Sequence, residues 1–138
     1  MKPLRLAVPA LLALVVPLTA AAPVGAAPAS RAASGRLVVS VVGASENGTW
    51  ELSCEPDGGT HPDAAAACDR LQELETTRRG GAFEPAAEGQ ACTMVHGGPA
   101  RATVHGTWNG RRVSASYSRA DGCEISRWEA LRPVLPRA

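Results

Sequence analysis

Four cysteines, which can pair as disulfides, and three histidines are the side chains of this 138-residue chain that could form a zinc site of the common cysteine–histidine type. A structural zinc site usually includes two cysteines that are two to four residues apart. No two cysteines stand that close here, and the histidines are scattered. We therefore expect no metal and no other cofactor. An even number of cysteines in an exported chain indicates two disulfides, with three pairings open, among Cys54, Cys68, Cys92 and Cys123.

The sequence lacks the motifs that build common active sites. It has no nucleophile elbow, no zinc-binding HExxH helix and no phosphate-binding glycine loop. His61 is expected in the first turn of a helix and His105 on the polar face of a strand, while His96 falls on a third segment. Three histidines on three elements are not expected to converge into a catalytic triad. The sequence therefore disfavours an enzyme such as a small hydrolase.

The beginning of the chain has the pattern of a secretory signal peptide, expected at residues 1–26. Two basic residues precede an apolar stretch from Leu6 to about Ala22, which small residues follow. The mature protein is therefore expected outside the cell. It should consist of a mobile arm at 27–35 and a single domain at 36–138.

The charge of the mature chain does not favour nucleic acid or a membrane surface as a partner. Without Lys2 and Arg5, 12 of the 14 basic residues remain against 13 acidic ones, so the net charge is near −1. Binding to phosphate backbones or anionic lipids depends on an excess of positive charge. We expect neither partner.

Alternating apolar residues predict two β-hairpins. An Asn-Gly pair is the typical two-residue hairpin turn, and it occurs at Asn47–Gly48 and again at Asn109–Gly110. The expected strands are residues 36–45, 49–54, 100–108 and 111–118.

A helix is expected between the two hairpins. Thr60 is its expected N-cap, and Pro62 would stand in the first turn. Residues 76–91, which are rich in glycine, should form a surface connection after the helix. The helix should bury one apolar stripe, formed by Ala64, Ala67, Cys68, Leu71 and Leu74.

The C-terminal residues predict a short helix and a last strand. Ile125, Trp128 and Leu131 have helical spacing, and Val134 with Leu135 could then form a strand. Since strands outnumber helices, the fold class is α+β, an antiparallel sheet covered by one main helix.

Met94 is the only methionine left after the signal peptide, and two interpretations of its position stay open. Thr93, Met94 and Val95 could be one more strand with Met94 in the core. Alternatively, Met94 could be an apolar anchor displayed on a disulfide-braced binding loop, whose fixed conformation would lower the ordering cost of association.

Several motifs, taken together with the order of the four cysteines, resemble the secreted subtilisin inhibitors of Streptomyces. The resemblance extends over essentially the whole mature chain. The matching motifs are LVVSVV at 37–42, GTHP at 59–62, Ala67–Cys68, Cys92 with Met94–Val95, WNGRRV at 108–113 and Cys123–Glu124.

This resemblance implies a five-stranded antiparallel sheet with one main and one short helix, and a homodimer formed through sheet faces. It also implies disulfides that pair Cys54 with Cys68 and Cys92 with Cys123. The implied function is inhibition of subtilisin-like and chymotrypsin-like serine endopeptidases. A binding module of the same fold that does not inhibit is the alternative.

The resemblance places the reactive site at the bond between Met94 and Val95. Ala91, Cys92 and Thr93 would then occupy the enzyme's subsites on the amino side, and His96 would follow Val95 on the carboxyl side. The chain departs from the family pattern at Thr93, where proline is common, and at Gly97 and Gly98. Both departures predict a looser loop, because proline restricts φ and glycine does not.

Overall fold

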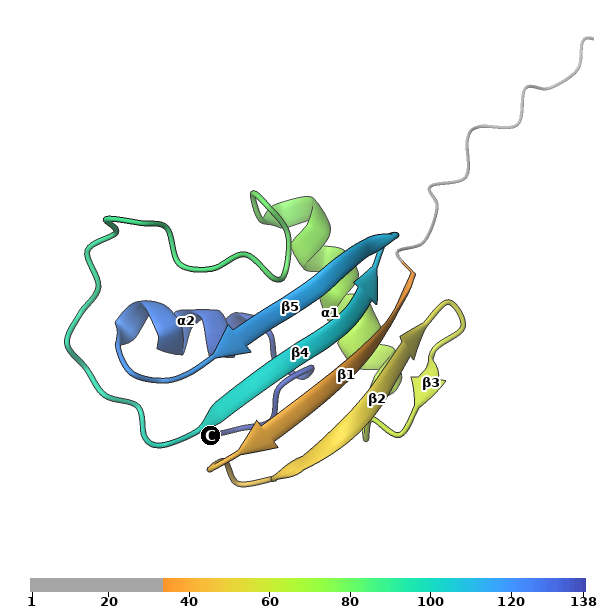
Figure 1. Ribbon diagram of the computed structural model, residues 1–138, viewed down its shortest axis with the longest axis horizontal. Coiled ribbons are helices and arrows are strands. Elements are labelled where there is room, and N and C mark those ends of the chain that lie inside the picture. The colour runs from red at the N-terminus through yellow and green to blue at the C-terminus, as the bar shows by residue number, and fades with distance from the viewer. Residues whose placement is uncertain (1–33) are drawn as a thin grey trace, which may run out of the picture. The chain divides into compact units, whose positions relative to one another are not determined.

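A computed structural model of the protein describes residues 34–138 (Figure 1). The signal peptide predicted at 1–26 and most of the arm predicted at 27–35 lie outside these residues. The domain is one antiparallel five-stranded sheet with strand order β3-β2-β1-β4-β5 and two helices. The elements are β1 (Gly35–Val42), β2 (Gly48–Cys54), β3 (Gly58–Gly59), α1 (Ala64–Thr77), β4 (Arg101–Trp108), β5 (Arg111–Tyr117) and α2 (Gly122–Ala130). The predicted α+β class is confirmed.

The core lies between the sheet and α1, on the inner face of the strands (Figure 1). Alternate residues of each strand point inward, as their spacing predicts; Leu37, Val39 and Val41 of β1 are almost completely buried. The predicted stripe of α1 packs against them, with Ala67, Cys68, Leu71 and Leu74 buried. Among the described residues, neither helix is long and apolar enough to cross a membrane.

The two predicted hairpins differ in their turns. Asn109 and Gly110 form the predicted turn between β4 and β5, with φ of 49° and 75°. The prediction of a turn at Asn47–Gly48 is wrong, because Gly48 already pairs with Val41 inside the β1–β2 ladder. The connection spans residues 43–47 instead, and the side-chain oxygen of Asn47 accepts a hydrogen bond from a backbone N–H within it.

The start of α1 also differs from the prediction. Asp63, not Thr60, is the N-cap. The Thr60 hydroxyl instead accepts a hydrogen bond of 2.9 Å from the backbone N–H of Glu51 in β2. His61 therefore precedes the helix rather than lying in its first turn; it is buried, and its Nε2 is 3.1 Å from the carbonyl oxygen of Val134. A threonine that binds the neighbouring strand is not free to cap a helix.

The C-terminal segment confirms the predicted short helix, which is α2, but not the predicted last strand. Val134 and Leu135 are fully buried, yet they lie in a turn and pair with no strand. Prolines stand on both sides of the pair, and proline cannot donate a hydrogen bond to a β-ladder. Val134 and Leu135 are apolar because both are buried in the core, and this explains why their sequence resembled a strand.

Tyr117, the only tyrosine, supplies a test of this core. It is 3% exposed, and burial raises the pKa of its hydroxyl to about 12, although the positive charge of Arg127 opposes the shift. The unfolded chain should release this proton near pH 10. Stability from this group is therefore complete below about pH 10 and is lost as the pH rises toward 12. Absorbance titration should give a midpoint near 12 while circular dichroism still reports a folded protein; a midpoint near 10 would contradict the burial.

Candidate functional site

The most exposed large apolar side chain of the described domain, Met94, lies beside the exposed Val95 in one loop, residues 91–98, between α1 and β4. Met94 is 95% exposed and Val95 is 59% exposed, and the segment is neither helix nor strand. The interpretation of Met94 as a core residue in a strand is therefore wrong. Figure 1 shows this part of the chain running around α2 before it enters β4.

Both disulfides have the pairing that the family resemblance implied. Cys54 at the end of β2 is bonded to Cys68 of α1, with 5.6 Å between their Cα atoms. Cys92 of the loop is bonded to Cys123 of α2, with a Cα–Cα distance of 5.3 Å. The first bond joins the helix to the sheet, and the second joins the loop to α2.

The loop is anchored to α2 just before Met94. In addition to the disulfide of Cys92, the backbone N–H of Gly122 donates a hydrogen bond of 2.9 Å to the carbonyl oxygen of Thr93. The hydroxyl side of Thr93 lies so close to Gly122 that a methyl group at position 122 would overlap Thr93 Oγ1. The backbone before Met94 is thus held by one covalent bond and one hydrogen bond.

A second anchor follows Val95 and His96. The N–H of Gly97 donates to the carbonyl oxygen of Arg119 at 2.8 Å, and Nε of Arg119 donates back to the carbonyl oxygen of Gly97 at 2.9 Å. Arg119 Nη1 also forms a 2.7 Å ion pair with Glu129 of α2. This hydrogen bond from Arg119 is the main cause that lowers the pKa of the Glu129 carboxyl.

Gly97 is packed rather than loose. A methyl group there would come within 2.9 Å of the Ile125 side chain and 3.0 Å of Arg119 Nε, so these side chains would have to shift to admit it. Gly98 has φ of +100° and open space around its Cα. The prediction of a loosened segment therefore remains a prediction at Gly98, whereas the contacts of Gly97 oppose it.

Between the two anchors, Met94, Val95 and His96 form no hydrogen bond with the part of the chain that the structure describes. All three are exposed, and so is Ala91 on the amino side. Free backbone N–H and C=O groups in such a segment can pair with the edge of another protein's sheet. The arrangement presents a short peptide, with a flexible apolar side chain at its centre, to a partner that has a matching pocket.

The rest of the described domain shows no site for covalent or metal chemistry. Its two clusters of three possible metal ligands each consist of a bonded disulfide pair and one aspartate, and a disulfide leaves no thiolate to bind a metal. His105 is exposed on β4, as predicted, while His61 is buried at the start of α1 and His96 lies in the loop.

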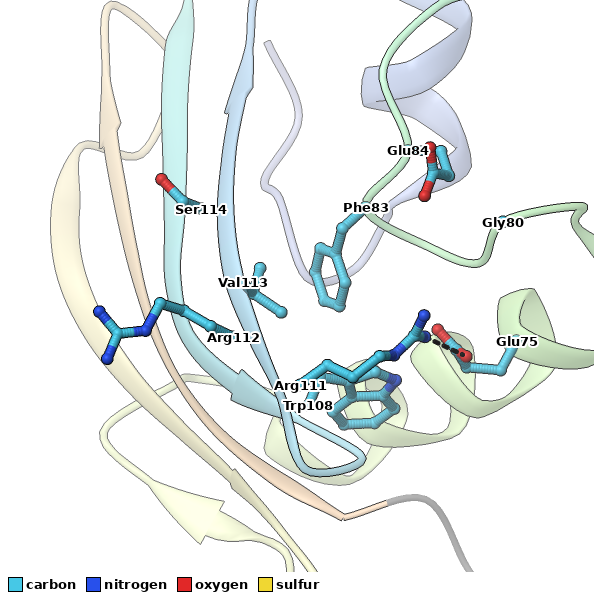
Figure 2. A pocket seen from close by; sticks show the side chains of 9 residues that line it. All are labelled: Glu75, Gly80, Phe83, Glu84, Trp108, Arg111, Arg112, Val113 and Ser114. Atoms are coloured by element: carbon cyan, nitrogen blue, oxygen red, sulfur yellow. Dashed lines mark hydrogen bonds and ion pairs between the residues drawn. The ribbon is translucent and has the colours of Figure 1, made fainter.

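A surface cavity of about 200 Å³ lies beside α1 and the second hairpin (Figure 2). Figure 2 shows Arg111 and Glu75 meeting above Trp108; their side chains are 3.5 Å apart. The indole nitrogen of Trp108 is the one buried side-chain N or O atom of the described residues without a hydrogen-bond partner. Ser114 is the only hydroxyl in the lining, and no histidine accompanies it, so the cavity lacks a nucleophile with a base.

Sequence reasoning missed three residues of the anchors: Arg119, Gly122 and Glu129. A signal existed for the region of Gly122, because Asp121 and Glu124 have the spacing of a helix N-terminus, and Asp121 Oδ1 does accept a 2.9 Å hydrogen bond from the N–H of Glu124. No local pattern could have indicated Arg119, because its partners are 22 and 10 residues away.

Known proteins that this chain resembles come from Streptomyces. Subtilisin inhibitor-like protein 2 of Streptomyces rochei is 43% identical over 75 residues, which are 52% of this chain and 61% of that protein. Subtilisin inhibitor-like protein 4 of Streptomyces lavendulae is 36% identical over 108 residues, which are 72% of this chain and 88% of that protein.

A third relative and a solved structure have related names. The transglutaminase-activating metalloprotease inhibitor of Streptomyces mobaraensis is 37% identical over 78 residues, 54% of this chain and 49% of that protein. Streptomyces caespitosus sermetstatin, solved in complex with Bacillus licheniformis subtilisin, is 26% identical with a TM-score of 0.48, covering 75% of this chain and 98% of that one. The family model described as subtilisin inhibitor-like matches residues 32–120, and the chain therefore belongs to the subtilisin inhibitor-like family.

Proposed function

We propose that this protein is a secreted inhibitor of serine endopeptidases of the subtilisin class. It would bind in the manner of a substrate and present the bond between Met94 and Val95 to the enzyme's serine. The observation that carries the proposal is Met94, 95% exposed on a loop that is anchored directly before it, at Thr93, and again after it, at Gly97. The two disulfides fit an oxidising compartment, which supports export.

The side chain of Met94 suits the proposed target. An unbranched apolar side chain fills the large apolar specificity pocket that subtilisin-like and chymotrypsin-like enzymes carry, and it brings no charge for the buried carboxylate of a trypsin-like pocket. Ala91, Cys92 and Thr93 would pair with the enzyme on the amino side of the bond, and His96 would follow Val95 on the carboxyl side. All of these positions lie on the one exposed segment.

Inhibition follows if the bond re-forms faster than it is hydrolysed. The enzyme's serine oxygen attacks the carbonyl carbon of Met94, the C–N bond to Val95 breaks, and the serine proton passes through the enzyme's histidine to the Val95 nitrogen. The anchors keep this new amine near the acyl carbon. Its return expels the serine oxygen and restores the peptide bond before water can add.

An equimolar titration of subtilisin with the purified protein tests the proposal. Complete loss of protease activity at one inhibitor chain per enzyme is the expected result, and the same titration with a trypsin-like enzyme should leave most activity in place. Rapid fragmentation of the protein with unchanged protease activity would instead assign it as a binding module of the same fold that does not inhibit.

We also propose a homodimer formed through the outer face of the sheet. Neither helix of the described domain covers this face (Figure 1), and it exposes Val38 and Val42 of β1 by 41% and 60%. A second copy would shield both valines. The mass in solution from sedimentation measures this directly, and a monomer at micromolar concentration would exclude it.

A further inference from the structure

We propose that Arg119 is a positioning residue that holds the Val95 amine in place after the enzyme's serine has displaced it; this inference rests on the proposed function. Arg119 contacts the loop only after the reactive bond. Its side chain is 12% exposed, and it connects the carbonyl oxygen of Gly97 to the carboxylate of Glu129. The inhibitor's leaving group is thereby attached to α2 through a charged side chain.

The hydrogen bonds between Arg119 and Gly97 restrict the chain that follows the reactive bond. Both backbone polar groups of Gly97 bond to Arg119, the N–H to its carbonyl oxygen and the carbonyl oxygen to its Nε. Two hydrogen bonds fix the direction of the chain, whereas one alone would act as a pivot. With both bonds present, the free amine of Val95 is only two residues from a fixed point.

The chain reach shows the size of the effect. Two residues can move the amine by at most about 7 Å from Gly97. If both hydrogen bonds to Gly97 were lost, the next fixed residue would be Ala100, which is 2% exposed and directly precedes β4. The free segment would then have five residues, 95–99, with a reach of about 17 Å. Because effective concentration falls with roughly the −3/2 power of tether length, the amine near the acyl carbon would be diluted up to about fourfold.

Dilution of the amine changes the outcome of acylation. Either the Val95 nitrogen attacks the acyl carbon and expels the serine oxygen, or water attacks and leaves Met94 with a carboxylate while the proton returns to the serine. Only the first path depends on the amine's position. Loss of the Arg119 side chain should therefore favour the nicked form without weakening the initial encounter, since Arg119 lies outside the exposed segment.

Arg70 provides a matched control. Like Arg119, it donates from Nε to a backbone carbonyl oxygen, that of Ala130 at 2.7 Å, and from Nη1 to a carboxylate, that of Glu73 at 2.6 Å. Its side chain is 28% exposed and lies on α1, and it contacts the C-terminal end of α2 but no residue of the loop through a hydrogen bond. Arg70→Met thus removes the same kinds of contact with no expected effect on the reactive bond.

The experiment uses the full disulfide-bonded chain as wild type, Arg119→Met, Arg119→Lys and Arg70→Met. Equimolar titration of subtilisin comes first: if the wild type does not inhibit, the proposed function fails rather than this inference. A trace of subtilisin is then added for days, and intact mass before and after reduction gives the ratio of nicked to intact protein. A second incubation starts from isolated nicked protein, in which subtilisin re-forms the bond, and should reach the same equilibrium ratio.

Arg119→Met removes the bond from Nε but keeps the backbone bond from the Gly97 N–H to the carbonyl oxygen of residue 119. We therefore expect it to raise the nicking rate and the ratio of nicked to intact protein by less than the fourfold limit, about twofold, with unchanged stoichiometry in the first minutes. Arg119→Lys should give a smaller rise and Arg70→Met none. A purely structural role would lower the melting temperature without shifting this ratio. A wild-type ratio in a folded Arg119→Met variant would overturn the inference. Should that variant fail to fold, Glu129→Gln, which removes only the charge, must raise the ratio or the inference falls.

Discussion

Met94→Asp is expected to weaken the inhibition of subtilisin by roughly a hundredfold to several thousandfold while leaving the fold unchanged. Met94 is almost fully exposed in the free protein, so the substitution removes no core contact. In the complex the same position would be desolvated in an apolar pocket, where an unpaired buried charge costs about 3 to 5 kcal/mol. Inhibition constants and melting temperature, measured on the same sample, separate the two effects.

Two further variants sharpen this test. Met94→Lys should shift inhibition toward trypsin-like enzymes, whose pocket carries a carboxylate that can pair with the ammonium group. Gln72→Asp places the same charge on an exposed residue of α1, outside the loop and the proposed dimer face, and should leave inhibition unchanged. Equal inhibition by wild type and a folded Met94→Asp protein would exclude the assignment of Met94 as the residue that enters the pocket.

Loss of the disulfide between Cys92 and Cys123 is expected to turn the inhibitor into a substrate. The bond closes a ring of 32 residues, for which the loop-entropy relation gives about 3.7 kcal/mol of stability. Its removal also leaves only the hydrogen bond from Gly122 to hold Thr93 in place. A chain carrying Cys92→Ser and Cys123→Ser should be cut after Met94 within the assay time, and subtilisin activity should return as cleavage proceeds.

The other disulfide supplies the control. Replacing Cys54 and Cys68 by serine opens a ring of 15 residues, worth about 3 kcal/mol by the same relation, but leaves both loop anchors in place. This variant should lose similar stability and still inhibit. If it became a substrate as readily as the variant without Cys92 and Cys123, general instability rather than the loop brace would explain the cleavage.

Sequence patterns correctly predicted the elements that depend on residues close together in the sequence. The hairpin around Asn109–Gly110 and the stripe of α1 follow from alternation and helical spacing, and both are present. The turn at Asn47–Gly48 carries the same sequence signal but is absent. There the chain turns earlier, at Gly43, whose φ is +72° and whose Cα lies close to the Pro99 carbonyl from the end of the loop. A contact so distant in sequence cannot be predicted from a dipeptide.

In the candidate site, too, short-range features were predictable from the sequence and long-range contacts were not. Composition indicated disulfides, and the resemblance to a family identified Met94, but periodicity alone could not distinguish an exposed methionine from a buried one. The anchors are still less predictable, since Arg119 bonds to residues on both the loop and α2. From the sequence alone, an arginine in a polar segment is expected to be exposed to solvent. Only the folded structure shows that a carbonyl oxygen and a carboxylate lie next to Arg119.

The bond after Met94 also divides the chain between two neighbouring strands at the centre of the sheet, β1 and β4. This bond separates the described domain into residues 34–94, with β1, β2, β3 and α1, and residues 95–138, with β4, β5 and α2. Yet β1 pairs with β4 along its whole length, from Gly35 opposite Trp108 to Val42 opposite Arg101. Each half therefore carries one side of a single core and a strand edge that only the other half covers. A chain cut after Met94 would therefore consist of two fragments that meet along the β1–β4 seam and share one core.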